Sequence, residues 1–390
     1  MTAVELVFWG CLLLLVYVYF GFPLLLLLRS RLYPRPYRIG SETPTVSVVI
    51  AARNEEGVIG SRVENLLQVD YPESKLEILV ASDGSDDGTN EIVRRYANGR
   101  VRLLELDRVG KAAALNAAVG TAAGEVLVFS DANSMFRADA VRQLVGPLAD
   151  PEVGGVAGNQ VYLSPEQGDA SVVGEQQYWN FDRSLKLAQS SAGSVTGATG
   201  AIYAIRRALF RPMRPDVNDD LLTSLRIVAQ GYRLVFAPEA VAYEPVVETA
   251  SQTFKRRVRV IARGLRCIVV MRELLDPRRH GFFSLQLLSH KLLLRTAALP
   301  LGLLAVVSGL LWNHGTVYRA AAIGQAGFYA LGALGIAFAD RRIAKLKLVA
   351  FPAYFCLVNA AAAKAIWELV RGETLERWEP DRSGPGDQAA

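Results

Sequence analysis

The chain has 390 residues, of which 51% are hydrophobic and 21% charged, with a formal net charge of +5. Apolar residues gather at the N-terminus and after about residue 285, which indicates a more polar centre between membrane segments. The positive charge does not indicate nucleic-acid binding, because no motif of that kind is present. The three cysteines and three histidines lack the spacing of a metal site or a disulfide framework.

The first segment, residues 1–30, is predicted to be a transmembrane helix. Residues 6–28 are almost wholly apolar, which is long enough to span a bilayer and too long for a signal-peptide core. Arg29 and Arg31 follow it, so its C-terminal end is expected in the cytoplasm. Residues 31–44 contain three prolines and are interpreted as a linker.

Strands and helices then alternate. Apolar strands are expected at 45–51, 76–82, 101–105 and 126–130, with helices at 57–68, 89–96, 111–119 and 138–149. Further along we expect a strand at 153–161, a helix at 171–189, a strand or close-packed loop at 195–205, a helix at 220–230 and a short strand at 234–237. This alternation predicts an α/β domain at 45–250 with a doubly wound, mainly parallel sheet.

The C-terminal part is expected to return to the membrane. Residues 253–271 are basic and amphipathic, which predicts a headgroup-facing interface helix within 251–280. Apolar segments at 292–311, 317–339 and 348–369 predict three transmembrane helices within 281–371. Residues 372–390 form a polar tail.

Carboxylates stand at the ends of several predicted elements: Glu55, Asp83, Asp131 and the pair Asp219-Asp220. Each alone is more typical of a turn or a helix N-cap. Together they are expected at one edge of the sheet, where parallel strands end and ligands bind. Clustered carboxylates need a cation to coexist, and Mg²⁺ prefers few carboxylates with substrate phosphates. Lys111, at the head of a predicted helix, would also favour a phosphate.

Six segments in chain order resemble the membrane-bound family-2 glycosyltransferases with a GT-A fold, relatives of cellulose, chitin and hyaluronan synthases. They are the opening strand and loop at 46–56, the Asp-Gly-Ser turn at 83–85, Gly-Lys-x-x-Ala-Leu-Asn at 110–116, Asp-Ala-Asn at 131–133 in the place of Asp-x-Asp, Asp-Asp at 219–220 in the place of Glu-Asp, and Arg-Arg-Val-Arg-Val at 256–260 in the place of Gln-x-x-Arg-Trp. The resemblance implies a GT-A-type mixed sheet.

The resemblance also implies residue roles. Asp220, assisted by Asp219, would be the general base that deprotonates the acceptor hydroxyl. Asp131 and Asn133 would hold Mg²⁺ or Mn²⁺ on the diphosphate. The nucleotide sugar would be bound by Ala52, Arg53, Glu55, Asp83, Gly84, Lys111, Ser130 and Asp131. The acceptor and diphosphate side would comprise Gly197, Thr199, Gly200, Arg256 and Arg259.

The expected function is therefore inverting transfer of a sugar from a UDP-linked donor to a lipid-linked or polysaccharide acceptor. It would occur at the cytoplasmic face of the plasma membrane, in cell-envelope or exopolysaccharide synthesis, with membrane lipid as a partner. Two alternatives stay open: a processive synthase that also translocates its product, and a non-catalytic membrane scaffold of the same fold. Asn133 in place of a second Asp weakens the metal site, and Val260 in place of Trp disfavours long-polymer synthesis.

Overall fold

The computed structural model describes residues 1–97, 99–163, 170–245, 250–339 and 346–372. The chain divides into two compact units, which we describe separately. The helical unit comprises Met1–Pro36, Tyr162–Thr196 and Val246–Thr374, and the sheet unit comprises Tyr37–Val161 and Gly197–Pro245. The polar tail beyond residue 372 lies outside the described residues.

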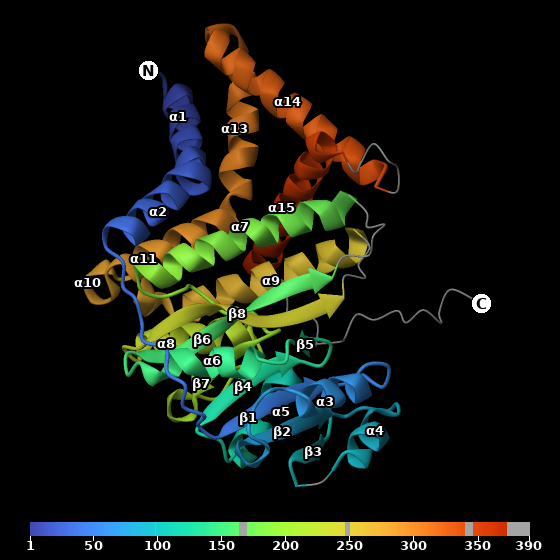
Figure 1. Cartoon of the computed structure of the whole chain (residues 1–390). Coiled ribbons are helices and arrows are strands. Elements are labelled where there is room, and N and C mark those ends of the chain that lie inside the picture. Colours follow the sequence, from blue (N-terminus) through green and yellow to red (C-terminus); the bar gives the residue numbers. More distant parts are fainter. Residues whose placement is uncertain (98, 164–169, 246–249, 340–345, 373–390) are drawn as a thin grey trace, which may run out of the picture. The chain divides into compact units, whose positions relative to one another are not determined.

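The sheet unit is built on one eight-stranded mixed sheet with the order β3-β2-β1-β4-β7-β6-β8-β5 (Figure 1). Strands β3, β2, β1 and β4 are parallel to one another. Strand β7 is antiparallel to both β4 and β6, and β5 is antiparallel to β8. The strands are β1 Val46–Ala52, β2 Leu76–Asp83, β3 Val101–Leu106, β4 Val126–Asp131, β5 Met135–Phe136, β6 Val153–Leu163, β7 Tyr203–Arg206 and β8 Arg233–Pro245. The predicted α/β mixed sheet is confirmed.

The register of the parallel strands brings their carboxyl ends to one edge. Ala51 of β1 pairs with both Ala81 of β2 and Asp131 of β4. The strands are apolar runs rich in Val and Ile, and all seven residues of β1 are buried, as expected for a parallel sheet covered on both faces. The loops that follow these strands therefore start side by side.

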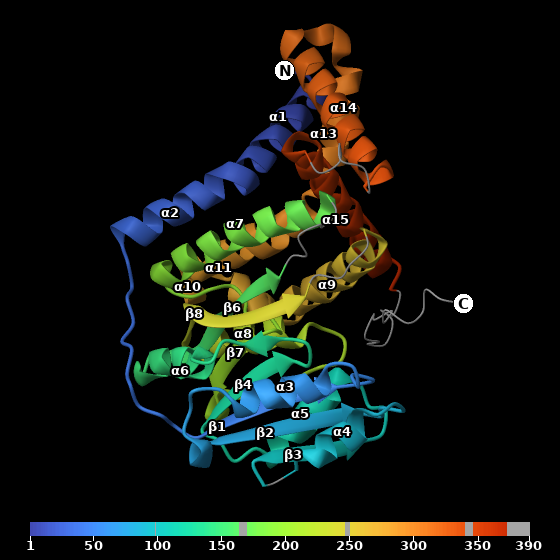
Figure 2. The ribbon, with the colours of Figure 1, turned by 45° about the vertical axis from the view of Figure 1, so that its right-hand side comes forward.

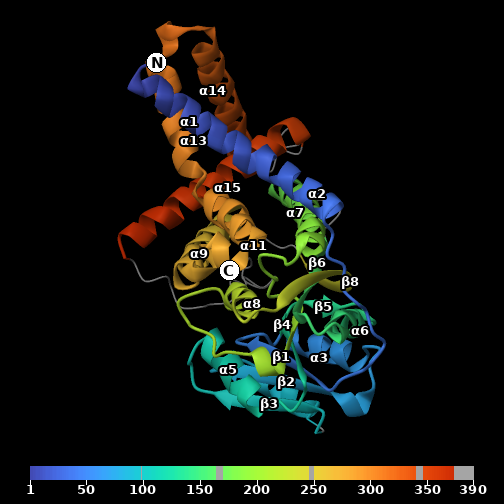
Figure 3. The ribbon, with the colours of Figure 1, turned by 90° about the vertical axis from the view of Figure 1, so that its left-hand side faces the viewer.

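Helices cover both faces of this sheet. Helices α3 (Ile59–Leu67) and α6 (Ala140–Val145) share one apolar core with alternate residues of β1, β2 and β4, and α3 is seen in Figure 2. Helix α5 (Lys111–Thr121) packs on β1 and β2 and is seen in Figure 3. The remaining helices of the unit are α4 (Thr89–Arg95) and α8 (Asp219–Ala229).

The helical unit holds the apolar segments. Its N-terminal helix runs through α1 (Ala3–Val16), a π-helical turn and α2 (Phe22–Leu32). Helix α1 packs on α13, and α2 on α7; α1, α13 and α14 can be followed in Figure 1. The other helices are α7 Ala170–Ala192, α9 Ala250–Val270, α10 Pro277–His280, α11 Phe282–Gln286, α12 Leu294–Thr296, α13 Ala298–Leu310, α14 Thr316–Ala337 and α15 Lys347–Val370.

Among the residues that the structure describes, three helices are long and apolar enough to cross a membrane: Ala3–Leu32, Thr316–Ala337 and Leu348–Val370. A fourth span is present if Phe282–Leu293 and Ala298–Leu310, which are bent by 60° relative to each other, count as one. The apolar segment predicted at 292–311 is not one continuous helix in the structure. A π-helical stretch at Leu287–Leu293 and a break before Ala298 interrupt it, and such breaks bend helices.

Candidate active site

A lysine and two carboxylates from distant parts of the chain meet at the carboxyl edge of the sheet. The Nζ of Lys111, the first residue of α5, donates to Oδ1 of Asp131 at 2.8 Å and lies 3.4 Å from Oδ2 of Asp219. Burial alone would lower the pKa of Lys111, but the carboxylates around it outweigh burial and raise that pKa. The lysine is therefore a permanent cation between two predicted site carboxylates.

Asp220 lies beside this group in the first turn of α8. Its Oδ1 accepts from its neighbour's backbone, Leu221 N, at 2.6 Å. Burial and the Asp219 carboxylate raise the pKa of Asp220 to about 6, against the opposing charge of Lys111. A base that titrates close to neutral pH suits proton abstraction.

The glycine-rich loop at 197–200 lies against Asp131. A Cβ on Gly200 would stand 2.9 Å from Oδ2 of Asp131, closer than side chains tolerate. The loop is also tied to α8, because Ala198 N donates to Oγ of Ser224 at 2.9 Å. The expected close backbone approach is confirmed at Gly200, and the loop connects the Asp131 end of the site with the helix that carries Asp220.

Asp83 holds the loop that precedes Lys111. It is 1% exposed, and its Oδ1 accepts from Val109 N at 2.7 Å and Gly110 N at 2.8 Å. Gly84 has a φ of 63°, and a Cβ there would stand 2.9 Å from Arg108 N. Asp83 thus has an anchoring role that the sequence did not indicate, and its contact with uridine stays a prediction.

The predicted nucleotide-binding loop after β1 is locked to the loop after β2. Asn54 adopts a positive φ of 50°, an uncommon conformation for a residue other than glycine. Its backbone N donates to Ser85 Oγ at 3.2 Å, and its Oδ1 accepts from Asp86 N at 3.1 Å. Glu55 N donates to Thr89 Oγ1 at 2.8 Å. These bonds fix the backbone around the half-buried Arg53 and the buried Ala52.

A buried arginine behind Asp131 was missed by the sequence analysis. The side chain of Arg62 is fully buried in α3, its Nη2 donates to Ser130 Oγ at 2.8 Å, and its guanidinium lies 4.1 Å from the centre of the Phe136 ring. Burial lowers the pKa of Arg62 to about 9, against the opposing effect of Asp131 and Glu244. An arginine on an amphipathic helix normally indicates a solvated face, so its spacing gave no signal.

The predicted donors for a divalent cation, Asp131 and Asn133, share the turn after β4. The Asp131 side chain is 36% exposed, so its carboxylate is open to a ligand. Within the described ranges, no three His, Cys, Asp or Glu residues could together hold a metal. Few protein oxygens suit Mg²⁺ or Mn²⁺ that also binds substrate phosphates; the residues present fit such an ion.

Arg256 and Arg259 lie in α9 of the helical unit, where Arg256 Nη1 is 3.5 Å from the hydroxyl of Tyr162. Their predicted role toward the diphosphate stays a prediction. Asn116, in contrast, acquires a clear structural role in the sheet unit. Its side chain pairs with Met213 through both the backbone N (2.7 Å) and the backbone O (3.0 Å), which holds the loop that leads to α8.

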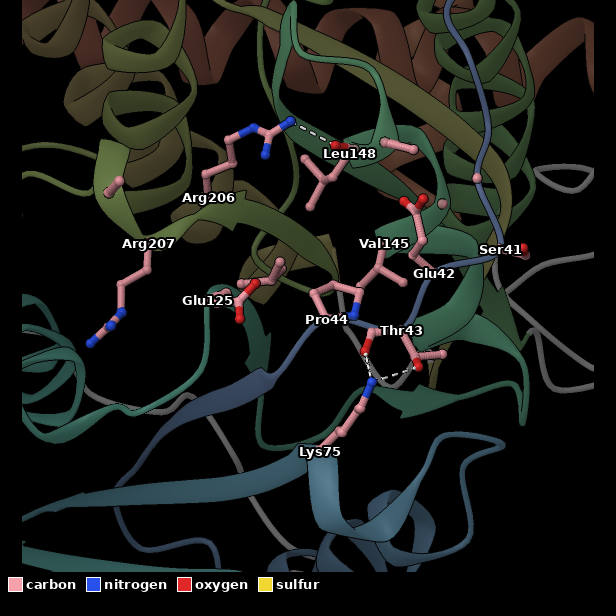
Figure 4. A pocket seen from close by; sticks show the side chains of 15 residues that line it. Ser41, Glu42, Thr43, Pro44, Lys75, Glu125, Val145, Leu148, Arg206 and Arg207 are labelled. Atoms are coloured by element: carbon pink, nitrogen blue, oxygen red, sulfur yellow. Dashed lines mark hydrogen bonds between the residues drawn. The ribbon is translucent and has the colours of Figure 1, made fainter.

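A pocket of about 790 Å³ lies at the opposite edge of the sheet, where Pro44, Lys75 and Val126 mark the beginnings of the parallel strands (Figure 4). Its basic side chains bind backbone oxygens. Lys75 Nζ donates to Thr43 O at 2.7 Å, and Arg206 Nη2 donates to Leu148 O at 2.6 Å. This pocket therefore lies between loops at the edge where the parallel strands begin, and it does not include the carboxylate cluster.

Comparison with known proteins agrees with this geometry. Residues 47–213 match the model of "Glycosyl transferase family 2", and that segment contains β1, β2, Lys111 and Asp131. This part of the chain therefore belongs to glycosyl transferase family 2. Lys111 and Asp131 of the cluster lie within the matched residues, whereas Asp219 and Asp220 lie beyond them.

The curated relatives of this chain are distant from it in sequence. The chain is 26% identical over 233 residues to an N-acetylglucosaminyltransferase of Rhizobium meliloti, covering 55% of this chain and 54% of that protein. It is 26% identical over 271 residues to the poly-beta-1,6-N-acetyl-D-glucosamine synthase of Staphylococcus aureus MSSA476, covering 67% and 64%. The chain thus spans only about half to two thirds of the length of these relatives.

One solved structure matches almost the whole chain. The mannosyltransferase PcManGT from Pyrobaculum calidifontis, in complex with GDP-Man and Mn²⁺, has a TM-score of 0.71 and 25% sequence identity. The match covers 94% of this chain and 99% of that one. The predicted fold, a GT-A-type domain with apolar helices at both ends, is confirmed by it.

Proposed function

We propose that the protein is a metal-dependent, inverting glycosyltransferase that moves a sugar from a nucleotide donor to a lipid-linked or polysaccharide acceptor. The single observation that carries this proposal is the arrangement of Lys111 between Asp131 and Asp219, with Asp220 beside them. It combines a cation for phosphate, an open carboxylate for a metal and a base poised near neutral pH. Family membership supports the same reaction.

The residues divide the reaction between them. Asp220 accepts the proton of the acceptor hydroxyl while its oxygen attacks the anomeric carbon. The bond from that carbon to the diphosphate oxygen breaks on the opposite face, which inverts the configuration. Lys111 stabilises the negative charge of the departing diphosphate. A divalent ion held by Asp131 and Asn133 would supply further charge neutralisation there.

Two nucleotides are candidates for the sugar donor, and they can be compared directly. UDP is the nucleotide expected from the family resemblance, with Arg53, Glu55 and Asp83 around its base and ribose. A second candidate is GDP-mannose, and it is favoured by one observation: the solved structure that matches 94% of this chain is a mannosyltransferase in complex with GDP-Man.

The acceptor side and the membrane side are part of the same proposal. The two curated relatives are named as an N-acetylglucosaminyltransferase and a polysaccharide synthase, which supports envelope or exopolysaccharide synthesis. Arginines flank the first span, which favours a cytoplasmic catalytic unit. Single addition is preferred over processive synthesis because Val260 stands where processive members carry Trp. The scaffold alternative is disfavoured by the intact cluster of Lys111 and the three carboxylates around it.

The test is nucleotide release by the purified full chain with Mn²⁺, using a panel of UDP-linked sugars and GDP-mannose and lipid-phosphate or oligosaccharide acceptors. We expect one nucleotide class to be released. Asp220→Asn should then lower transfer about 10²- to 10⁴-fold while nucleotide binding persists, and Asp131→Ala should abolish the Mn²⁺-dependent part of binding. Wild-type protein that releases no nucleotide from any donor would support the scaffold alternative.

A further inference from the structure

A chain of hydrogen-bonded polar side chains runs through the sheet unit to Thr199, the residue before Gly200, which lies against Asp131. The chain starts at Glu244 of β8, which is 6% exposed. The two carboxylate oxygens of Glu244 accept hydrogen bonds from Ser134 Oγ and from the side-chain amide N of Gln160. Both oxygens of the Glu244 side chain are therefore occupied as acceptors.

The hydrogen bond to Glu244 fixes the orientation of the Gln160 side chain. A carboxylate can only accept hydrogen bonds, so the Gln160 amide must turn its NH₂ toward Glu244 and its carbonyl oxygen away. That oxygen lies 2.5 Å from Thr199 Oγ1. Since an amide oxygen can only accept, the hydroxyl proton of Thr199 is committed to Gln160. The Thr199 oxygen is left with lone pairs alone, and it can only accept from a ligand.

Thr199 lies in the loop between Asp131 and helix α8. It precedes Gly200, whose backbone lies against Oδ2 of Asp131, and follows Ala198, which is bonded to Ser224 of α8. Thr199 and Gln160 are both half-buried. The loop therefore lies between the proposed metal carboxylate and the helix that carries the proposed base, where a sugar must lie during transfer.

We propose that the chain Glu244–Gln160–Thr199 is a sugar-recognition element in which the Thr199 oxygen accepts a hydrogen bond from a sugar hydroxyl. Gln160 and Glu244 are positioning residues that act through Thr199. This inference rests on the proposed glycosyltransferase function and adds the group that reads the sugar, as distinct from the nucleotide.

The test compares Thr199→Val, which keeps the shape of the side chain and removes its hydroxyl, with Thr199→Ser, which restores the hydroxyl. We expect Thr199→Val to lower kcat/KM for transfer about 10-fold, as the loss of one hydrogen bond with an unsatisfied partner predicts. Thr199→Ser should recover most of that loss. Binding of the free nucleoside diphosphate with Mn²⁺ should be equal in wild type, Thr199→Val and Thr199→Ser. Thr121→Val, whose hydroxyl contacts only its own helix at Ala118 O, is the matched control and should transfer like wild type.

Further measurements identify the source of the hydroxyl. If it belongs to the donor, Thr199→Val weakens binding of the nucleotide sugar; if it belongs to the acceptor, only the KM of the acceptor rises. Gln160→Met is a second variant that keeps the test valid should Thr199→Val fail to fold, and it should give the same selective loss. In a double-mutant cycle its effect should not add to that of Thr199→Val.

Equal transfer by Thr199→Val and Thr199→Ser would overturn this inference, and so would an equal loss of free-nucleotide binding in Thr199→Val. Neither result would touch the proposed function, which fails only if the wild-type chain transfers no sugar. The two failures are therefore distinguishable in one set of experiments.

Discussion

At the scale of single residues, the site depends on how four charges share a small volume. Lys111 lies within 3.4 Å of both Asp131 and Asp219, and it therefore lowers the energy of two carboxylates that would otherwise repel each other. Asp220 forms no direct ion pair among the described residues, and burial and Asp219 raise its pKa to about 6. The same cluster thus holds ionised carboxylates for phosphate chemistry and one carboxylate that can exchange a proton.

This arrangement predicts opposite pH shifts for two variants. Asp219 raises the pKa of Asp220 and Lys111 lowers it. Because the base must be deprotonated, activity should rise with pH through an acidic limb near pH 6. Asp219→Asn should move the midpoint of that limb to lower pH and Lys111→Met to higher pH, each by up to about one unit. The measurement is kcat/KM against pH; midpoints that stay together would remove Asp220 from the role of base.

Gly200 is predicted to be required because of its contact with Asp131. In Gly200→Ala the added Cβ would stand 2.9 Å from Oδ2, so the carboxylate or the loop must shift. We expect a loss of Mn²⁺-dependent nucleotide affinity of about 10-fold, which corresponds to about 1.4 kcal/mol, measured by titration calorimetry.

The control for Gly200→Ala is Gly120→Ala in α5. A Cβ there meets nothing within 4 Å, so this variant should bind nucleotide normally and should gain about 0.5–1 kcal/mol of stability from the removal of a helical glycine. Equal binding by the two alanine variants would contradict the assigned contact.

Sequence reasoning found residues whose chemistry is local and missed those whose role depends on folding. Asp131 and Lys111 could be predicted because each stands at the end of a recognisable element. Arg62, Gln160 and Glu244 could not, because each is an ordinary polar residue in a helix or strand pattern. Only the fold brings them to Ser130, Thr199 and Ser134.

At the scale of elements, the regular strands and helices could be predicted because apolar β-branched runs and amphipathic periods are strong local signals. All four parallel strands lie within one or two residues of the expected bounds. The irregular parts could not be predicted. Strand β5 has two residues, and β8 extends over Arg233–Pro245, far beyond the short strand expected at 234–237, because pairing with neighbouring strands extends it.

The pairing of α14 with α15 predicts which glycines of α14 are essential. A Cβ on Gly332 would stand 2.5 Å from Cys356 Sγ and 2.9 Å from Pro352 O, as in membrane helices that approach through small residues. Gly332→Val should destabilise the chain by about 1–3 kcal/mol through overpacking. The measurement is thermal unfolding in detergent. Gly327→Val in the same helix, where a Cβ meets nothing within 4 Å, should leave the melting temperature nearly unchanged; equal effects would contradict the helix contact.

At the scale of the whole molecule, the residues of the proposed active site and the apolar helices belong to different units. The carboxylate cluster and the polar chain to Thr199 are built entirely within the sheet unit, while every candidate span belongs to the helical unit. Composition alone predicted a polar centre between apolar ends. It did not predict that residues 162–196 join the helical unit, because α7 is neither apolar nor basic enough to be recognised as part of it. The predicted domain bounds at 45–250 stay a prediction.

The number of crossings sets the side on which each loop lies. With the sheet unit in the cytoplasm, the bent pair Phe282–Leu293 and Ala298–Leu310 either crosses the membrane or re-enters on the same side. We expect a crossing, because α14 follows directly and the basic residues after it, Arg341 and Arg342, require a return to the cytoplasm. The loop at Trp312–His314 should then lie outside. Asn313→Cys should react with a membrane-impermeant maleimide in intact cells, whereas Glu91→Cys, exposed on α4, should react only after permeabilisation. Wild-type chain measures the background from its three native cysteines.

Two labelling results would contradict this topology. Labelling of Asn313→Cys only after permeabilisation would make the bent pair re-entrant, and labelling of Glu91→Cys in intact cells would place the sheet unit outside.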